Sequence, residues 1–197
     1  MKQKLFYTLL LITSIHTFSQ ETKFTIEANY PFTMGENFIG NNYEGIADAG
    51  FKYRFTDAKL VNLGLSVNGS LLNYNFKVQD DFAEQFNYKV NAYFIQPRIL
   101  AELTIASIEK LHPSASLGYS FILFSVVGPD PLDFSNETAK DSQSGINLNI
   151  ALAYDLTEKI FIQLQYDFIK LGTANDISNT AYNTNVDLLK IGLGFRI

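Results

Sequence analysis

The sequence predicts an all-β protein, an eight-stranded antiparallel up-and-down transmembrane β-barrel behind an N-terminal signal peptide. Three observations carry this prediction. Beyond the first nineteen residues, no window holds the roughly 18 consecutive apolar residues of a membrane-spanning helix. Apolar and polar residues instead alternate with a period of two in eight successive segments, as they do in strands with two different faces. The connections between these segments alternate between long and short.

The composition narrows the class of protein further. Hydrophobic residues make up 47% of the 197 residues and charged residues only 18%, which excludes a disordered chain. The net charge of −5 gives no support for nucleic-acid binding. There are no cysteines, so disulfides, thiol catalysis and cysteine zinc sites are excluded.

Residues 1–19 have the pattern of a secretory signal peptide. Lys2 and Lys4 precede a short apolar run that ends at Ile15. Thr17 and Ser19 place small residues at positions −3 and −1 of a cut before Gln20. The apolar run is too short for a spanning helix. We therefore expect residues 1–19 to be removed and residues 20–197 to form the barrel domain.

The first four strands are expected at 23–30, 43–55, 60–72 and 88–103. In the first, Phe24, Ile26 and Ala28 share one face, and Glu27 lies on the other. The next two strands alternate in the same way. The fourth is less regular, because aromatic and aliphatic residues also occur on its polar face and Pro97 removes one backbone donor. Pro97 therefore predicts a bulge or a local kink.

The last four strands are expected at 111–124, 146–156, 160–171 and 189–197. Each again sets Leu, Ile, Phe or Tyr against small or polar residues. The long connections are expected at 31–42, 73–87, 125–144 and 172–184, and the shorter ones at 56–59, 104–110 and 157–159. Outer-membrane barrels show this rhythm, with short periplasmic turns and longer external loops.

The two faces of these strands differ enough to predict which one points inward. The polar face carries many glycines, serines and alanines that fit a narrow eight-stranded interior, and the other face carries nearly all the bulky apolar residues. We expect the bulky face to contact lipid. The interior would then hold a plugging network of ion pairs and hydrogen bonds rather than an open pore, with these charged residues: Glu27, Asp48, Lys52, Arg54, Arg98, Glu102, Asp167, Lys190 and Arg196.

The C-terminal residues 190–197 resemble the assembly signal of bacterial outer-membrane proteins, in which a polar residue and a glycine precede aromatic and apolar positions. The matching positions are Lys190, Gly192, Phe195 and Ile197, the last standing where Phe is commoner. The chain as a whole is similar to the OmpA/OmpX-type small barrels, and to the porin-like "outer membrane protein β-barrel domain" proteins of Bacteroidota. The resemblance implies a location in the outer membrane of a Gram-negative cell and no shared catalytic residues. It also implies contact with outer-membrane lipid, with lipopolysaccharide and, during biogenesis, with the barrel-assembly machinery.

Catalytic and metal-binding patterns are weak. His112 shares a face with Ser114 and Ser116, which is compatible with a hydrolase or acyltransferase. No acid lies at a spacing that pairs with this histidine, and filling of the polar lumen is the favoured interpretation. Carboxylates at 80–84 and 130–141 are suited to Ca²⁺ but lack the EF-hand spacing. We expect no enzyme activity, no cofactor and no metal.

Four functions remain open at this point. The favoured one is a structural or interaction scaffold that displays long external loops and binds an extracellular or periplasmic partner of unknown identity. A small-solute porin, a membrane enzyme and a soluble lipocalin-like ligand-binding barrel are the alternatives.

Overall fold

The computed structural model describes residues 23–56, 60–79, 85–129, 136–173 and 178–197. The expected signal peptide and most of the acidic segments at 80–84 and 130–141 lie outside these ranges. None of the helices in the described part of the chain is long and apolar enough to cross a membrane.

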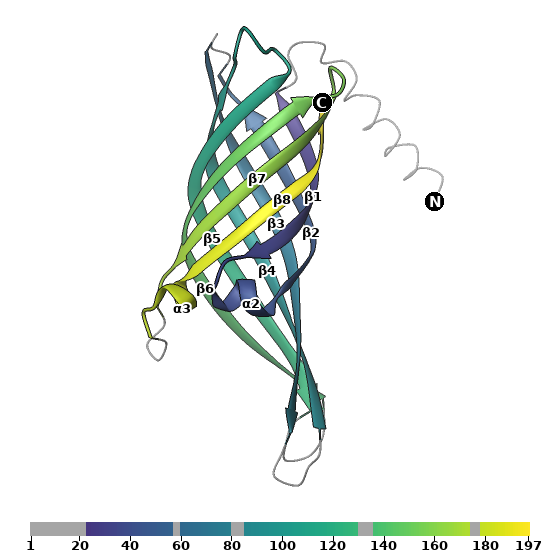
Figure 1. Cartoon of the computed structure of the whole chain (residues 1–197), viewed down its shortest axis with the longest axis vertical. Coiled ribbons are helices and arrows are strands. Elements are labelled where there is room, and N and C mark those ends of the chain that lie inside the picture. Colours follow the sequence, from purple (N-terminus) through teal and green to yellow (C-terminus); the bar gives the residue numbers. More distant parts are fainter. Residues whose placement is uncertain (1–22, 57–59, 80–84, 130–135, 174–177) are drawn as a thin grey trace, which may run out of the picture.

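Eight strands form one closed barrel in which each strand pairs with its neighbours in sequence order and β1 pairs with β8 (Figure 1). All pairings are antiparallel, so the predicted up-and-down topology is confirmed. The strands are β1 (Phe24–Met34), β2 (Glu44–Arg54), β3 (Val61–Gln79), β4 (Gln85–Leu103), β5 (Leu111–Pro129), β6 (Asn136–Asp155), β7 (Ile160–Leu171) and β8 (Asn185–Arg196).

The barrel has two unlike ends. The end with the connections at 55–60, 104–110 and 156–159 also holds the C-terminus, and we call it the turn end (Figure 1). The opposite end, the loop end, holds the longer connections. Closure of the sheet leaves no free edge, since β1 and β8 pair from Thr25–Arg196 to Met34–Asp187.

At the loop end, β3 to β6 continue well beyond the other strands (Figure 1). β3 and β4 stay paired as far as Gln79 and Gln85, and β5 and β6 as far as Pro129 and Asn136. We call residues 74–79, 85–90, 124–129 and 136–144 the four-strand extension. The prediction of long loops over 73–87 and 125–144 is therefore wrong for most of those residues. In these residues the outer face of the strands is not uniformly apolar, so the sequence there lacks the regular alternation of apolar and polar residues from which strands are predicted.

The expected bulge at Pro97 is absent. Ile95 pairs with Phe121 and Arg98 with Gly118, so β4 and β5 keep one register on both sides of the proline. The irregularity lies in β2 instead, where the pairing with β3 shifts between Gly45 and Ala47. A Cβ on Gly45 would lie 1.6 Å from the carbonyl oxygen of Pro31, so the close approach of the chains requires glycine there.

Two short helices close part of the loop end (Figure 1). Helix α2 (Phe38–Asn42) begins at Asn37, whose side chain accepts a hydrogen bond from the Gly40 N–H at 2.7 Å. Helix α3 (Ala181–Thr184) begins at Thr180 in the same manner. Gly35, with φ of 84°, supplies the left-handed turn between β1 and α2. As a result, Ile39 lies 2% exposed at the barrel mouth.

The orientation of the faces agrees with the sequence prediction. Leu63, Leu148 and Ile191 point outward with 40%, 43% and 51% exposure, whereas Arg98 and Lys190 point inward with 4% and 0%. The small residues of the inward face permit close strand packing. This orientation contradicts the soluble lipocalin-like alternative, which requires the bulky apolar side chains to be inside.

Candidate functional site inside the barrel

A buried cluster of charges around Lys190 occupies the centre of the lumen. The Lys190 ammonium donates to Asp48 Oδ2 at 2.7 Å and to Gln96 Oε1 at 2.9 Å, and lies 2.9 Å from Asp167 Oδ2. The side chains of Lys190, Asp48 and Asp167 are 0% exposed. Because a charge removed from water is costly unless it is paired, these three groups depend on one another.

Arg98 extends the cluster across the lumen. Its guanidinium donates to Asp167 Oδ2 at 2.8 Å, to Asn147 Oδ1 at 2.7 Å and to Asn68 Oδ1 at 3.1 Å. Asn149 donates to the second oxygen of Asp167 at 2.6 Å. The central carboxylates are thus surrounded by donors from several strands.

Glu27 and Lys52 form a second buried ion pair on the neighbouring strands β1 and β2. The other Glu27 oxygen accepts a hydrogen bond from Gln165 Nε2 at 3.0 Å. Gln163, which faces the same side of β7 as Gln165, donates to Asn29 Oδ1 at 2.7 Å. Gln165 thus links the Glu27–Lys52 pair to β7, and Gln163 adds a second link between β7 and β1.

A third layer of charges lies at the turn end. Arg54 contacts Glu102 at 2.9 Å. Asp155 is shared, with Oδ1 2.7 Å from Arg196 and Oδ2 2.9 Å from His112 Nε2. The Arg196 guanidinium also lies over the Phe161 ring at 4.8 Å. These residues fill the lumen opening next to the C-terminus.

All nine charged residues singled out from the sequence point inward and pair with a residue of opposite charge in these three layers. The sequence reasoning missed Asp155. Its position was readable, because continuing the alternation of Asn147 and Asn149 along β6 places residue 155 on the same face. It also assigned no partner to the lumen amides. Asn68 and Asn149 contact residues of the adjacent strand, whereas Gln96, Asn147 and Gln165 contact residues of strands with which their own strands do not pair.

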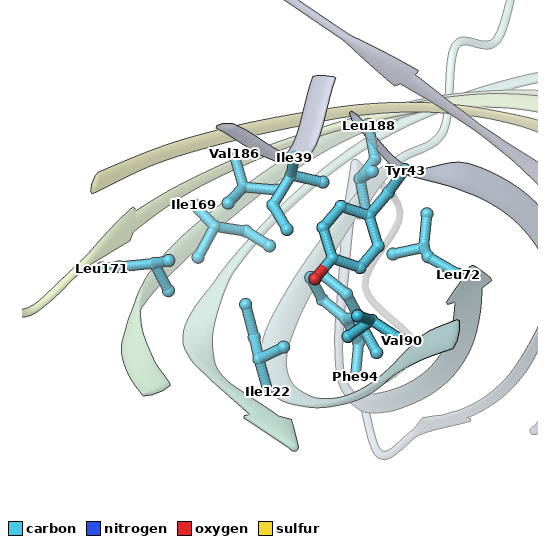
Figure 2. Packing of buried hydrophobic residues seen from close by; sticks show 11 residues of the cluster. Ile39, Tyr43, Leu72, Val90, Phe94, Ile122, Ile169, Leu171, Val186 and Leu188 are labelled. Atoms are coloured by element: carbon cyan, nitrogen blue, oxygen red, sulfur yellow. The ribbon is translucent and has the colours of Figure 1, made fainter. Parts of the chain in front are cut away.

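The half of the lumen at the loop end is apolar. The prediction of a polar interior along the whole barrel is therefore wrong for this half. Figure 2 shows side chains from α2, from the segment after it and from the barrel wall converging on one cluster. Its members include Ile39, Tyr43, Leu72, Val90, Phe94, Ile122, Ile169, Leu171, Val186 and Leu188. Burial raises the pKa of the Tyr43 phenol to about 12, and the nearby Tyr74 adds to the shift. Phe94, an exception to the alternation of the fourth strand, belongs to this cluster.

His112 does have an acidic partner, Asp155, contrary to the sequence expectation. A histidine held by a carboxylate is two-thirds of a hydrolytic triad. Among the residues that the structure describes, no serine hydroxyl is hydrogen-bonded to His112: Ser116 donates to Asn149 Oδ1 at 3.2 Å, and Asp155 also contacts Arg196. Among the described residues, no group of three or more His, Asp or Glu side chains is arranged to hold a metal ion.

The four residues predicted to form a C-terminal assembly signal differ in their surroundings. Lys190 is buried in the central cluster, whereas Phe195 and Ile197 are each 39% exposed on the outside. Gly192 packs against β1, where a Cβ would lie 2.2 Å from the Ala28 carbonyl oxygen. The folded barrel thus buries the polar position of the predicted signal and leaves its last aromatic and apolar positions on the surface.

The closed sheet of eight meandering antiparallel strands, with charged residues inside and bulky apolar residues outside, is the fold of the small outer-membrane β-barrels. No known protein family matches the sequence, and no curated protein does. The fold is similar to that of Neisserial surface protein A, with a TM-score of 0.55 and 14% identity over 89% of this chain and 97% of that one. OprG from Pseudomonas aeruginosa has a TM-score of 0.55 and 12% identity, over 88% and 95%.

A third similar structure is Ail, the attachment invasion locus protein of Yersinia pestis, in complex with the heparin analogue sucrose octasulfate. It has a TM-score of 0.54 and 11% identity, over 88% of this chain and 96% of that one. At these identities the likeness concerns the fold.

Proposed function

We propose that this chain is an integral outer-membrane barrel that serves as a scaffold, with a plugged lumen and its loop end outside the cell. The observation that carries the proposal is the outward face of the barrel. Ile99, Leu117 and Ile146 are 65%, 58% and 61% exposed, and comparable side chains surround the barrel. Such a surface is incompatible with water and suits the hydrocarbon of a bilayer, where only closed barrels and helices satisfy their backbone groups.

The proposal of a plugged lumen rests on the burial of the central charges. Lys190, Gln96 and Gln165 are at most 1% exposed. An open channel would leave such side chains in contact with water. The apolar cluster next to them adds a second obstacle to ions.

Location is tested by fractionation of cells that express the full chain. We expect the protein in the detergent-extracted outer-membrane fraction and not in the soluble periplasm. We also expect slower migration in gels after boiling, because a folded barrel resists SDS and runs more compactly. Recovery in the soluble fraction without detergent would contradict the membrane location.

Closure of the lumen is tested by electrical recording. Purified protein in planar bilayers is expected to give no reproducible ohmic steps of the size that an open aqueous porin gives in the same bilayer. The porin serves as the positive control, and boiled protein controls for contaminating channels. Steps of porin size from the folded protein alone would favour the small-solute transport alternative.

The partners proposed for this scaffold follow from its place in the membrane. The outward apolar face would contact outer-membrane lipid, and the loop end would meet lipopolysaccharide. The exposed C-terminal positions Phe195 and Ile197 suit reading by the barrel-assembly machinery. The four-strand extension offers a surface for an extracellular protein partner.

A further inference from the structure

A pocket of about 540 Å³ lies at the loop end, between α2 and the four-strand extension. Its volume falls in the range of small-molecule sites. Ile39 and Tyr43, which are 2% and 4% exposed, form the most buried part of its lining, together with Val90 and Leu171, each 5% exposed. The buried part of the pocket lining thus belongs to the apolar cluster of Figure 2, and the described lining includes none of the central charged residues.

One wall of the pocket is a row of aromatic rings. Tyr43 lies 5.4 Å from Tyr74, which stacks on Phe76 with centroids 5.2 Å apart and planes 22° from parallel. Phe76 stacks in turn on Tyr88 at 5.2 Å and 14°. Phe124, 6.2 Å from Tyr43, also lines the pocket. Aromatic faces of this kind favour a flat apolar ligand body.

Part of the pocket lining is polar, and among the described residues its one charged member is Asp141, the cross-strand partner of Phe124. The amides of Gln143, Asn183 and Asn185 complete this polar part, and no Lys or Arg of the described residues lines the pocket. The Lys170 ammonium lies close by and donates to Asn185 Oδ1 at 2.8 Å. Asp141 accepts one hydrogen bond from the Ser142 N–H at 2.7 Å, and a carboxylate has acceptor capacity beyond a single bond. Asp141 is exposed, so its attraction for a ligand charge is moderate.

We propose that this pocket binds a small organic cation with a flat aromatic body and a single primary amine, the body against Tyr74, Phe76 and Phe124 and the amine at Asp141. A carbohydrate fits less well, because most of the lining offers no hydrogen bonds. A carboxylate-bearing ligand meets the wrong charge. The site is distinct from the central charged cluster, none of whose residues is in the described lining.

The ligand class is tested by calorimetric titration of the folded protein in zwitterionic lipid nanodiscs, with empty nanodiscs as the blank. The probes are 1-naphthylmethylamine, 1-naphthylmethanol and 1-naphthoate, which share one ring system and differ in charge. We expect the amine to bind most tightly and the carboxylate most weakly. Asp141→Asn is expected to weaken the amine roughly fivefold and to leave the alcohol unchanged, as for a partly exposed charge pair.

The place of binding is tested with two tryptophan variants of adjacent residues. Val126→Trp fills the pocket and is expected to weaken the amine at least tenfold. Val127→Trp, whose side chain lies on the outer face, is the matched control and is expected to bind as the wild type does. Folding of each variant is checked by its gel migration before and after boiling.

Three results would overturn the proposal: no binding heat from the amine above the empty-nanodisc blank, equal affinity for all three probes, or equal effects of the two tryptophan variants. If Val126→Trp does not fold, the Asp141→Asn variant and the three probes on the wild-type protein still test whether the pocket binds the amine. Because these titrations use purified folded protein, a negative result leaves the proposed membrane location untouched.

Discussion

Replacing Lys190 with Met is expected to lower the free energy of unfolding by about 3–5 kcal/mol, the cost of breaking a buried ion pair. The ammonium lies between Asp48 and Asp167, and all three side chains are 0% exposed. Met keeps most of the volume but leaves Asp48 without its cation. The measurement is a denaturant titration of the protein refolded in lipid vesicles, followed by far-ultraviolet circular dichroism.

Lys159→Met is the matched control, since Lys159 is exposed in the turn between β6 and β7 and is expected to change stability by less than about 0.5 kcal/mol. Adding Asp48→Asn to Lys190→Met is expected to recover part of the loss, because it removes the carboxylate left unpaired. A loss below about 1 kcal/mol for Lys190→Met would show that the central cluster contributes little to stability.

Gly118→Ala is expected to destabilise the barrel by about 1–3 kcal/mol, the usual cost of overpacking a tightly packed site. A Cβ at this position would lie 2.0 Å from the Pro97 carbonyl oxygen and 2.7 Å from the Arg98 Cα. Both are backbone atoms, which cannot move aside without disturbing the β4–β5 pairing. The same denaturant titration measures the effect.

Gly69→Ala is the control for Gly118→Ala. Gly69 also lies inside a strand, but a Cβ there would have its nearest neighbour, the Phe94 carbonyl oxygen, at 3.8 Å. We expect no loss, or a gain of about 0.4–1 kcal/mol from the reduced freedom of the unfolded chain. Equal effects of the two substitutions would contradict the steric explanation.

Much of the strand pattern was predictable because alternation is a local property. The turn-end limits of β3, β4, β5 and β7 fall within one residue of the expected positions, since turn residues interrupt the alternation sharply there. The loop-end limits were less accurate. Beyond Leu72 and Phe124, strands continue with mixed faces, and a strand that leaves an apolar environment no longer needs a regular pattern.

The charged residues of the lumen were predictable as a set but not as pairs. Lys190 and Asp48 are 142 positions apart, and their contact depends on how far each strand is staggered when the sheet closes. The apolar pocket at the loop end was unpredictable for a related reason. The pocket is lined by residues of α2 and of several strands that are far apart in the sequence, and no single segment contains enough of these residues to reveal it.

The sequence by itself determined that the chain forms eight strands, which face of each strand is polar and which end of the barrel has the short turns. These features follow from a period of two and from turn residues, both of which act over a few positions. Only the tertiary structure decided which charges meet, that Asp155 joins Arg196 to His112, and that the lumen divides into a charged half and an apolar half. Contacts across a closed barrel depend on register and curvature, which are properties of the whole sheet.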